Sequence, residues 1–192
     1  MASRSRTSQP KTVRQSTALL LAALTFAAGL TLGAMLPSSK NAPAPTPAAK
    51  ADDSAAHIAE IERTAQQQPD NADVWIHLGN AYYDAHQPAQ AASAYEKALA
   101  ITPDNADVHT DLGTSYRLLG KYEQAIAHYD EALARQPRHH NARLNRGIVL
   151  YYDLGRKQEA LEAWNRLLQL APDAKGPDKT PLKDYIARHS AQ

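Results

Sequence analysis

Apolar residues follow two different patterns along the chain. From Thr17 to Leu36 they form a nearly continuous run of 20 residues that contains no charge. From about residue 55 onward they recur at three- and four-residue spacing, which is the period of one face of an α-helix. We therefore expect one long apolar helix, followed by a series of shorter amphipathic helices that pack into an all-α domain.

The amphipathic part of the chain repeats after 34 residues. The segment that begins at Asn71 aligns with the segment that begins at Asn105. Seven positions carry the same residue in both: Leu78 and Leu112, Gly79 and Gly113, Tyr82 and Tyr116, Ala91 and Ala125, Tyr95 and Tyr129, Ala98 and Ala132, Pro103 and Pro137. Small residues let two helices approach closely, and proline ends a helix. Each segment therefore predicts a pair of packed helices.

This pattern resembles the tetratricopeptide repeat (TPR) family, whose repeat carries Trp, Leu-Gly, Tyr, Ala, an aromatic residue, Ala and Pro at these spacings. Trp75 heads the first complete repeat, whereas His109 and Arg143 occupy that place in the next two. The resemblance implies a TPR solenoid of stacked antiparallel helix pairs with a capping helix at each end. The expected divisions are an N-terminal cap (55–71), three repeats (72–105, 106–139 and 140–174), and a C-terminal capping helix with a tail (175–192).

The capping helices are predicted from short apolar stripes. Ile58 and Ile61 form the stripe of the N-terminal cap, and Leu182, Tyr185 and Ile186 form that of the C-terminal cap. A stacked array needs such caps because its terminal repeats would otherwise expose apolar faces.

The third repeat departs from the period by one residue. Gly113 and Ala125 are 12 positions apart, whereas Gly147 and Ala160 are 13 apart. We place the inserted residue near positions 150–153. It can be absorbed either as a bulge in the helix or in the turn at Gly155.

The N-terminal third of the chain reads as a membrane anchor. Residues 1–16 form a basic tail, residues 17–36 are long enough as a helix to span a bilayer, and residues 37–54 are a Pro- and Ala-rich extended linker. A cleaved secretory signal is the alternative, although its apolar core is usually shorter. Basic residues stay on the cytoplasmic side, so the repeats are expected outside the cytoplasm, in the periplasm of a Gram-negative cell. Gly29 and Gly33 form a Gly-x-x-x-Gly pair that could support a homodimer.

Composition argues against most chemistry. The net charge is +1, which gives no indication of nucleic-acid binding, and the chain has no cysteine. No phosphate-binding loop or nucleophile motif occurs, so we expect no cofactor and no enzymatic activity. We interpret the histidines as solvated or edge-packed, with an adventitious metal site at His139 and His140 as the alternative. They are His57, His77, His86, His109, His128, His139, His140 and His189.

In TPR proteins the first helix of each pair lines a concave groove that holds an extended peptide, and the resemblance carries these groove positions to this chain. They are Asp73, Ile76, His77, Asn80, Tyr83 and Asp84 in the first repeat; Asp107, Thr110, Asp111, Thr114, Arg117 and Leu118 in the second; and Asn141, Leu144, Asn145, Ile148 and, across the insertion, Tyr152 in the third. The alternative is that these side chains only face solvent.

The groove residues also indicate the charge of the ligand. The Lys and Arg positions with which some TPR domains clamp a C-terminal carboxylate are occupied here by Ile76, Asn141 and Asn145. Four aspartates face one arginine, so we expect a neutral or basic segment rather than an acidic C-terminus.

The sequence therefore predicts a membrane-anchored scaffold that binds a protein or peptide partner during assembly of an envelope complex. Its architecture is similar to the TPR modules of bacterial cytochrome c biogenesis, which makes cytochrome c maturation one candidate pathway. The alternative is a structural envelope protein that self-associates and binds no client peptide.

Overall fold

A computed structural model of the chain describes residues 47–190. The predicted basic tail (1–16), the predicted transmembrane helix (17–36) and residues 37–46 of the predicted linker lie outside the described residues. Within the described part, no helix is both long and apolar enough to cross a bilayer.

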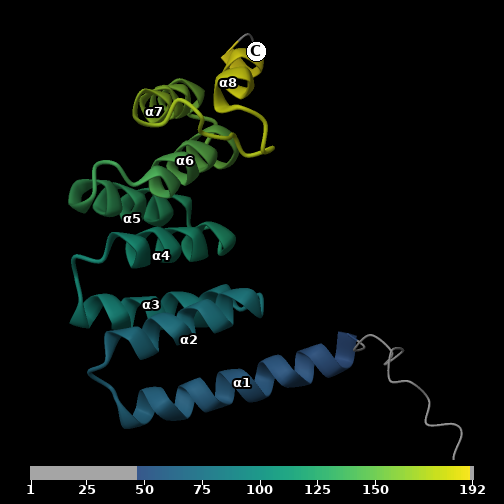
Figure 1. Ribbon diagram of the computed structural model, residues 1–192, viewed down its shortest axis with the longest axis vertical. Coiled ribbons are helices and arrows are strands. Elements are labelled where there is room, and N and C mark those ends of the chain that lie inside the picture. Colours follow the sequence, from purple (N-terminus) through teal and green to yellow (C-terminus); the bar gives the residue numbers. More distant parts are fainter. Residues whose placement is uncertain (1–46, 191–192) are drawn as a thin grey trace, which may run out of the picture. The chain divides into compact units, whose positions relative to one another are not determined.

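The described residues form helices and one isolated antiparallel bridge between Lys175 and Pro181. The elements are α1 (Pro47–Gln67), α2 (Ala72–Asp84), α3 (Pro88–Ile101), α4 (Ala106–Leu118), α5 (Tyr122–Arg135), α6 (His140–Ile148), the π-helix η2 (Val149–Asp153), α7 (Lys157–Leu170) and α8 (Leu182–Ser190). Each α-helix contacts the next one in chain order (Figure 1). The prediction of an all-helical stack of helix pairs is confirmed for this part of the chain.

Helix α1 corrects the linker prediction. It begins at Pro47, so residues 47–54 are helical rather than extended. The stretch from Pro47 to Ala56 is rich in alanine, the strongest helix former, and proline is well tolerated in the first turn of a helix. Further along α1, Ile58 and Ala65 are buried and Ile61 is half-buried, as expected for a helix that covers the next one.

The first helix of each repeat begins in the same way. Asn71, Asn105 and His139, each 34 residues apart, are the N-caps of α2, α4 and α6. In each case the side chain accepts a hydrogen bond from a backbone N–H in the first turn of the helix. Such caps stabilise a helix by about 1 kcal/mol.

A second bond closes the turn before each of these helices. Three different side chains donate to the carbonyl oxygen of the proline six residues earlier. They are Trp75 Nε1 to Pro69 O at 2.8 Å, His109 Nε2 to Pro103 O at 3.0 Å, and Arg143 Nη2 to Pro137 O at 2.7 Å. The position that is Trp in the TPR pattern is thus a side-chain N–H donor in all three repeats.

Glycine allows the two helices of each repeat to approach closely. A Cβ atom added at Gly79 would lie 2.4 Å from the Tyr95 ring, one at Gly113 would lie 2.8 Å from the Tyr129 ring, and one at Gly147 would lie 2.1 Å from Nε1 of Trp164. The three aromatic residues are almost completely buried. The repeat glycines are therefore packing residues, as predicted.

The inserted residue of the third repeat is absorbed by the helix and not by the turn. Residues Val149–Asp153 form the π-helix η2, and the N–H of Leu154 donates to the carbonyl oxygen of Val149 at 3.0 Å. The turn that follows is the same in both repeats, because Gly155 (φ 67°) and Gly120 (φ 72°) share the left-handed conformation. In the first repeat His86 occupies this place with φ 57°.

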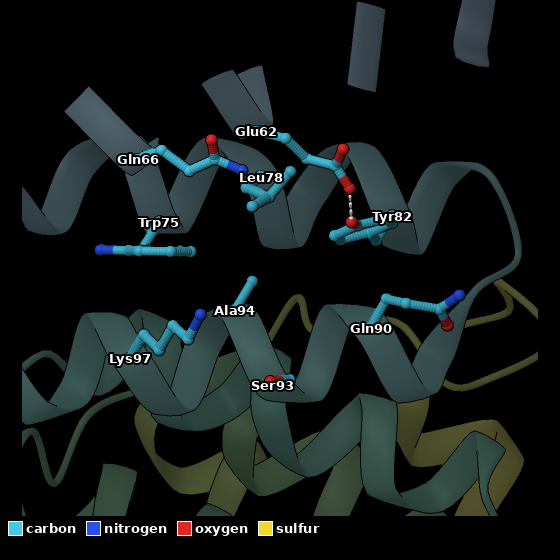
Figure 2. A pocket seen from close by; sticks show the side chains of 9 residues that line it. All are labelled: Glu62, Gln66, Trp75, Leu78, Tyr82, Gln90, Ser93, Ala94 and Lys97. Carbon is cyan, nitrogen blue, oxygen red and sulfur yellow. Dashed lines mark hydrogen bonds between the residues drawn. The ribbon is translucent and has the colours of Figure 1, made fainter. Parts of the chain in front are cut away.

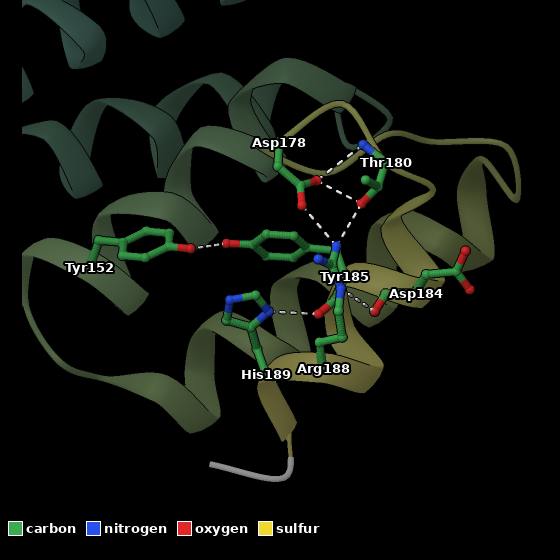
Figure 3. A network of polar contacts seen from close by, with 7 residues as sticks. All are labelled: Tyr152, Asp178, Thr180, Asp184, Tyr185, Arg188 and His189. Atoms are coloured by element: carbon green, nitrogen blue, oxygen red, sulfur yellow. Dashed lines mark hydrogen bonds and ion pairs between the residues drawn. The ribbon is translucent and has the colours of Figure 1, made fainter.

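The C-terminal helix α8 covers the last pair with Leu182, Tyr185 and Ile186, which are all buried as predicted. Figure 3 shows the polar contacts that hold it: the Tyr185 and Tyr152 hydroxyls form a hydrogen bond, and Arg188 donates to both Asp178 (2.7 Å) and Thr180 (2.8 Å). The Thr180 and Arg188 hydrogen bonds lower the pKa of Asp178 to about 2. The segment that leads into α8 is thus fixed to the helix itself.

Candidate functional site

A cavity of about 360 Å³ lies among the first helices of the three repeats. It is lined by Asn80, Tyr83 and Asp84 of α2, Tyr95 of α3, Asp111 and Thr114 of α4, and Asn145 of α6. Six of these seven residues belong to the predicted groove. A second cavity of about 360 Å³ shares Asn80 and Asp84 and extends past His77 to α1, where it contacts Ser54, His57, Ile58 and Ile61.

The carboxamide of Asn80 has a fixed orientation. The Tyr95 hydroxyl reaches from α3 and donates to Oδ1 of Asn80 at 2.7 Å. Because Oδ1 is occupied, the Nδ2 group is the end of the amide that remains to donate to a ligand. Asn80 is exposed, so a ligand can reach this donor.

The carboxamide of Asn145 is oriented in the opposite sense. Its Nδ2 donates to Oγ1 of Thr114 at 3.4 Å, and the Thr114 hydroxyl in turn donates to the carbonyl oxygen of Thr110 at 3.0 Å. The Tyr129 hydroxyl lies 3.2 Å from Thr114 Oγ1 and completes the network. The Oδ1 atom of Asn145 is therefore the end that can accept a hydrogen bond from a ligand.

Asp111 gives the cavity a partly buried carboxylate. Burial, and secondly repulsion from Asp107, raise the pKa of Asp111 to about 6, against an opposing effect of His139. Asp107 itself accepts a hydrogen bond at 2.8 Å from His139 Nε2. His139 Nδ1 accepts the N–H of Ala142 at 3.1 Å, so the proton of the neutral ring must reside on Nε2. At neutral pH the cavity therefore carries the charge of Asp111 in addition to that of Asp84 at its rim.

The one basic residue of the predicted groove is already paired. Arg117 Nε lies 2.5 Å from Oδ2 of Asp153, and both side chains are largely buried. Asp153 belongs to the π-helix, so the inserted residue of the third repeat places an acid against the second repeat. Since Asp153 offsets the charge of Arg117, the cavity keeps its acidic character.

Several predicted groove residues lie elsewhere. Thr110 is buried, and its hydroxyl donates to the carbonyl oxygen of Ala106 at 2.9 Å, so its assignment to an open groove is wrong. Ile76, Leu144 and Ile148 are half-buried and pack against the hydrophobic core. They occupy the sides of α2 and α6 that face neighbouring helices, and any part they have in the groove is limited to their exposed edges.

The remaining groove residues surround the cavity without lining it. Asp73 faces a separate cavity beside the turn between α1 and α2. Asp107 pairs with His139. Asn141, Leu118 and Tyr152 are exposed, and the Tyr152 hydroxyl is bonded to Tyr185. The structure thus brings Asn80, Tyr83, Asp84, Asp111, Thr114 and Asn145 together, with His77 in the adjoining cavity.

Tyr95 is the lining residue that the sequence analysis missed. Its ring was assigned to the core, where it does pack, but its hydroxyl reaches the groove. The signal was present, because a buried tyrosine hydroxyl needs a hydrogen-bond partner and a phenylalanine would not. Tyr129 repeats the arrangement 34 residues later, and burial raises its pKa to about 12.

The histidine interpretation needs correction at two positions. His109 and His139 are buried rather than solvated. His109 Nδ1 lies 3.3 Å from His128 Nδ1, and the two rings stack. Since His109 Nε2 donates to Pro103, His128 must supply the proton shared by the pair. Within residues 47–190, no group of three or more His, Asp or Glu side chains is placed to hold a metal ion.

Solved structures with the same fold share little sequence with the chain. The crystal structure of MamA superimposes with a TM-score of 0.62 at 19% identity, over 73% of this chain and 86% of MamA. The first TPR of Spaghetti (RPAP3), solved with the HSP90 peptide SRMEEVD, gives 0.56 at 23% identity over 62% and 90%. The Arabidopsis OM64 TPR domain gives 0.56 at 24% identity over 63% and 95%. These similarities establish the fold.

No curated protein sequence matches the chain significantly. Two family models, both described as tetratricopeptide repeat, match residues 70–138 and residues 110–175. Together they cover the region from the first N-cap to the end of the third repeat, which is more than half of the 192 residues. The chain belongs to the tetratricopeptide repeat family.

Proposed function

We propose that the protein is an adaptor that binds an extended segment of a partner protein in the cavity between α2, α4 and α6. The observation that carries this proposal is the pair of oriented amides. Asn80 presents a donor and Asn145 presents an acceptor, each fixed by a hydrogen bond on its other end. An extended backbone offers both a C=O and an N–H, so it can use both amides at once.

The charge of the cavity favours a neutral or basic segment. Asp84 and Asp111 line the cavity, while Arg117 is neutralised by Asp153. The relative bound to the peptide SRMEEVD shows that this fold can hold a peptide with acidic residues. In this chain Ile76, Asn141 and Asn145 stand where basic clamp residues would be required, so we expect no such acidic C-terminus here.

The cellular setting of the proposal rests on the sequence alone. Residues 17–36 would anchor the protein in the inner membrane, with the N-terminus in the cytoplasm and the repeats on the extracytoplasmic side. Assembly of envelope complexes is the role that this arrangement suits, and cytochrome c maturation is one candidate. The alternative is self-association through the Gly29 and Gly33 pair, without a client.

Site-specific photo-crosslinking tests the proposal. A photoreactive phenylalanine derivative replaces Tyr83 in the cavity, and a control carries it at Gln124, which is exposed on the second helix of the second repeat. We expect a discrete partner to be captured from Tyr83 and not from Gln124. Replacing Asn80 and Asn145 by alanine should lower capture about tenfold, because each lost bond to the ligand is worth about 1 kcal/mol.

The outcomes separate the two candidate functions. Capture that is equal at Tyr83 and Gln124, or that is unchanged when both asparagines are replaced, would contradict the adaptor proposal. Crosslinks only between copies of the protein would favour the self-associating alternative.

A further inference from the structure

Neighbouring second helices of the array enclose a small slot on the side opposite the groove. In the first repeat the slot lies between α1 and α3, and Figure 2 shows Trp75, Leu78, Ala94 and Lys97 among its lining residues. Its volume is about 310 Å³. The Lys97 ammonium lies 4.1 Å above the Trp75 ring. We call this space and its counterparts the outer slots.

The second repeat fills its outer slot with one side chain. His128 stands 34 residues after Ala94, and its ring stacks on Tyr116 at 5.4 Å and on His109 at 5.5 Å between ring centres. The surrounding framework is otherwise unchanged. Tyr116 donates to Glu96 as Tyr82 donates to Glu62 in the first repeat. The size of the residue at this one position therefore decides whether the slot is open.

The third repeat reopens the slot and changes its chemistry. Alanine returns at Ala163, which is 35 residues after His128 because of the insertion, and a cavity of about 290 Å³ is present. The places of Trp75, Leu78 and Lys97 are taken by arginines. These lining arginines are Arg143, Arg146 and Arg166, and the lining acids are Asp130, Glu159 and Glu162.

The arginines of this slot are not equally satisfied. Arg146 donates to Asp130 at 2.6 Å, while Glu159 is held by Arg156 outside the slot at 2.6 Å. Arg166 donates to the neutral Gln169 at 2.7 Å. Within residues 47–190, neither Arg143 nor Arg166 forms an ion pair, although both line the slot.

Arg143 is the least satisfied of the three. It donates to the carbonyl oxygen of Pro137, but its Nε is buried and has no hydrogen-bond partner among the described residues. Burial and the nearby Arg166 and Arg146 guanidinium groups lower the pKa of Arg143. A buried, unpaired donor on a charged group is unfavourable, and an anion beside it would offset both the burial and the repulsion.

We propose that the outer slot of the third repeat binds a single carboxylate, the side chain of an Asp or Glu on a partner protein, between Arg143 of α6 and Arg166 of α7. Guanidinium groups match a carboxylate with paired hydrogen bonds. The acids at the rim select for a lone carboxylate, since Asp130 and Glu162 would repel a polyanion such as a nucleic-acid backbone. This site is independent of the groove and has the opposite charge preference.

The test uses the full-length protein in detergent and follows the Nε–H resonance of Arg143 by NMR. The probe is the blocked tripeptide acetyl-Ala-Glu-Ala-amide, with acetyl-Ala-Gln-Ala-amide as the neutral match. We expect a saturable shift of the Arg143 signal with the glutamate peptide only. Arg166→Gln should weaken this binding about tenfold, because it removes one charge-assisted contact.

Lys97→Gln is the matched control, since Lys97 holds the equivalent position in the first repeat and the substitution removes the same charge. It should leave the shift unchanged, and both variants should melt as the parent does because both side chains are exposed. Equal shifts with the Glu and Gln peptides, or equal loss of binding in both variants, would overturn the proposal. Inorganic phosphate that binds more tightly than the glutamate peptide would also overturn it, since recognition would then follow total charge.

Discussion

The second and third repeats build the same helix pair from chains that differ by one residue. In the second repeat α4 runs unbroken from Ala106 to Leu118, whereas in the third repeat α6 ends at Ile148 and continues as the π-helix η2. The contact of glycine with an aromatic ring precedes the insertion, and the left-handed glycine turn follows it. The difference teaches that these two points fix the repeat, and that the helix between them can widen by one residue.

The widened turn also has a use in this chain. It places Asp153 against Arg117 of the preceding repeat, with both side chains largely buried. The insertion therefore ties the third repeat to the second through an ion pair. It also removes the only unpaired cation that the predicted groove would have had.

The largest expected effect comes from the aromatic side of the glycine contact. Trp164→Ala should lower the free energy of unfolding by about 3–5 kcal/mol, because it empties a fully buried site. The Trp164 ring also packs edge-on against Tyr185 of α8, at 5.3 Å between centres. Hydrogen exchange should therefore show α8 losing protection. Tyr129→Phe is the control, and should cost only about 1 kcal/mol, since it removes one hydroxyl.

The glycine side of the same contact should have the next largest effect. Gly147→Ala and Gly113→Ala should each destabilise the protein by about 1–3 kcal/mol through overpacking, measured as urea unfolding. We expect the larger loss at Gly147, where the added Cβ atom would lie 2.1 Å from Trp164 Nε1 rather than 2.8 Å from the nearest ring atom of Tyr129. Displacing the indole would also strain its 3.2 Å bond to the carbonyl oxygen of Leu144. Equal losses at both glycines would show that the two contacts are interchangeable.

How far the sequence predicts this structure depends on which way a side chain points. The spacing of Gly79, Gly113 and Gly147 was enough to place the helix pairs, because close packing there admits only one arrangement. The assignment of Thr110 failed for the opposite reason. Its position, shared with Ile76 and Leu144, lies at the boundary between groove and core, and the helical period does not resolve that boundary.

The groove residues that could not be predicted depend on contacts between helices. No local pattern indicates that the Tyr95 hydroxyl crosses from α3 to orient Asn80. Likewise His139 reads as a surface histidine, until its alignment with Asn71 and Asn105 shows that it is a helix cap. Local sequence therefore predicts the scaffold better than it predicts the orientation of polar groups on it.

Asp111 allows the second repeat to be converted towards the third, because Asn145 stands at the equivalent position. Burial raises the pKa of Asp111 to about 6, so its ionisation opposes folding once the pH exceeds the value of the unfolded chain near 4. Asp111→Asn should therefore stabilise the protein at pH 7.5, by about 1 kcal/mol after allowance for solvent screening. The gain should disappear as the pH falls from about 6 to 4. Thermal melts at pH 4 and pH 7.5 check this, and a gain that persists at pH 4 would contradict it.

The smallest expected effect is at the turn that ends the first helix. His86→Gly gives the first repeat the glycine that the other two have at this left-handed position, and should stabilise it by about 0.5–1 kcal/mol. Gly120→Ala is the reciprocal change and should destabilise by a similar amount, since nothing lies within 4 Å to obstruct the added methyl group. Opposite signs in urea unfolding would confirm that backbone conformation alone is at issue.

The bonds from Trp75, His109 and Arg143 to the preceding prolines have a consequence for the exchange of residues between repeats. An indole, an imidazole and a guanidinium differ in size, charge and aromaticity, yet each delivers a proton to the same carbonyl oxygen. Anyone grafting or shuffling these repeats could interchange the three, whereas leucine or phenylalanine would leave the carbonyl without its partner. What this position retains from one repeat to the next is a hydrogen-bond donor of sufficient reach, which a substitution table built on chemical similarity would not group together.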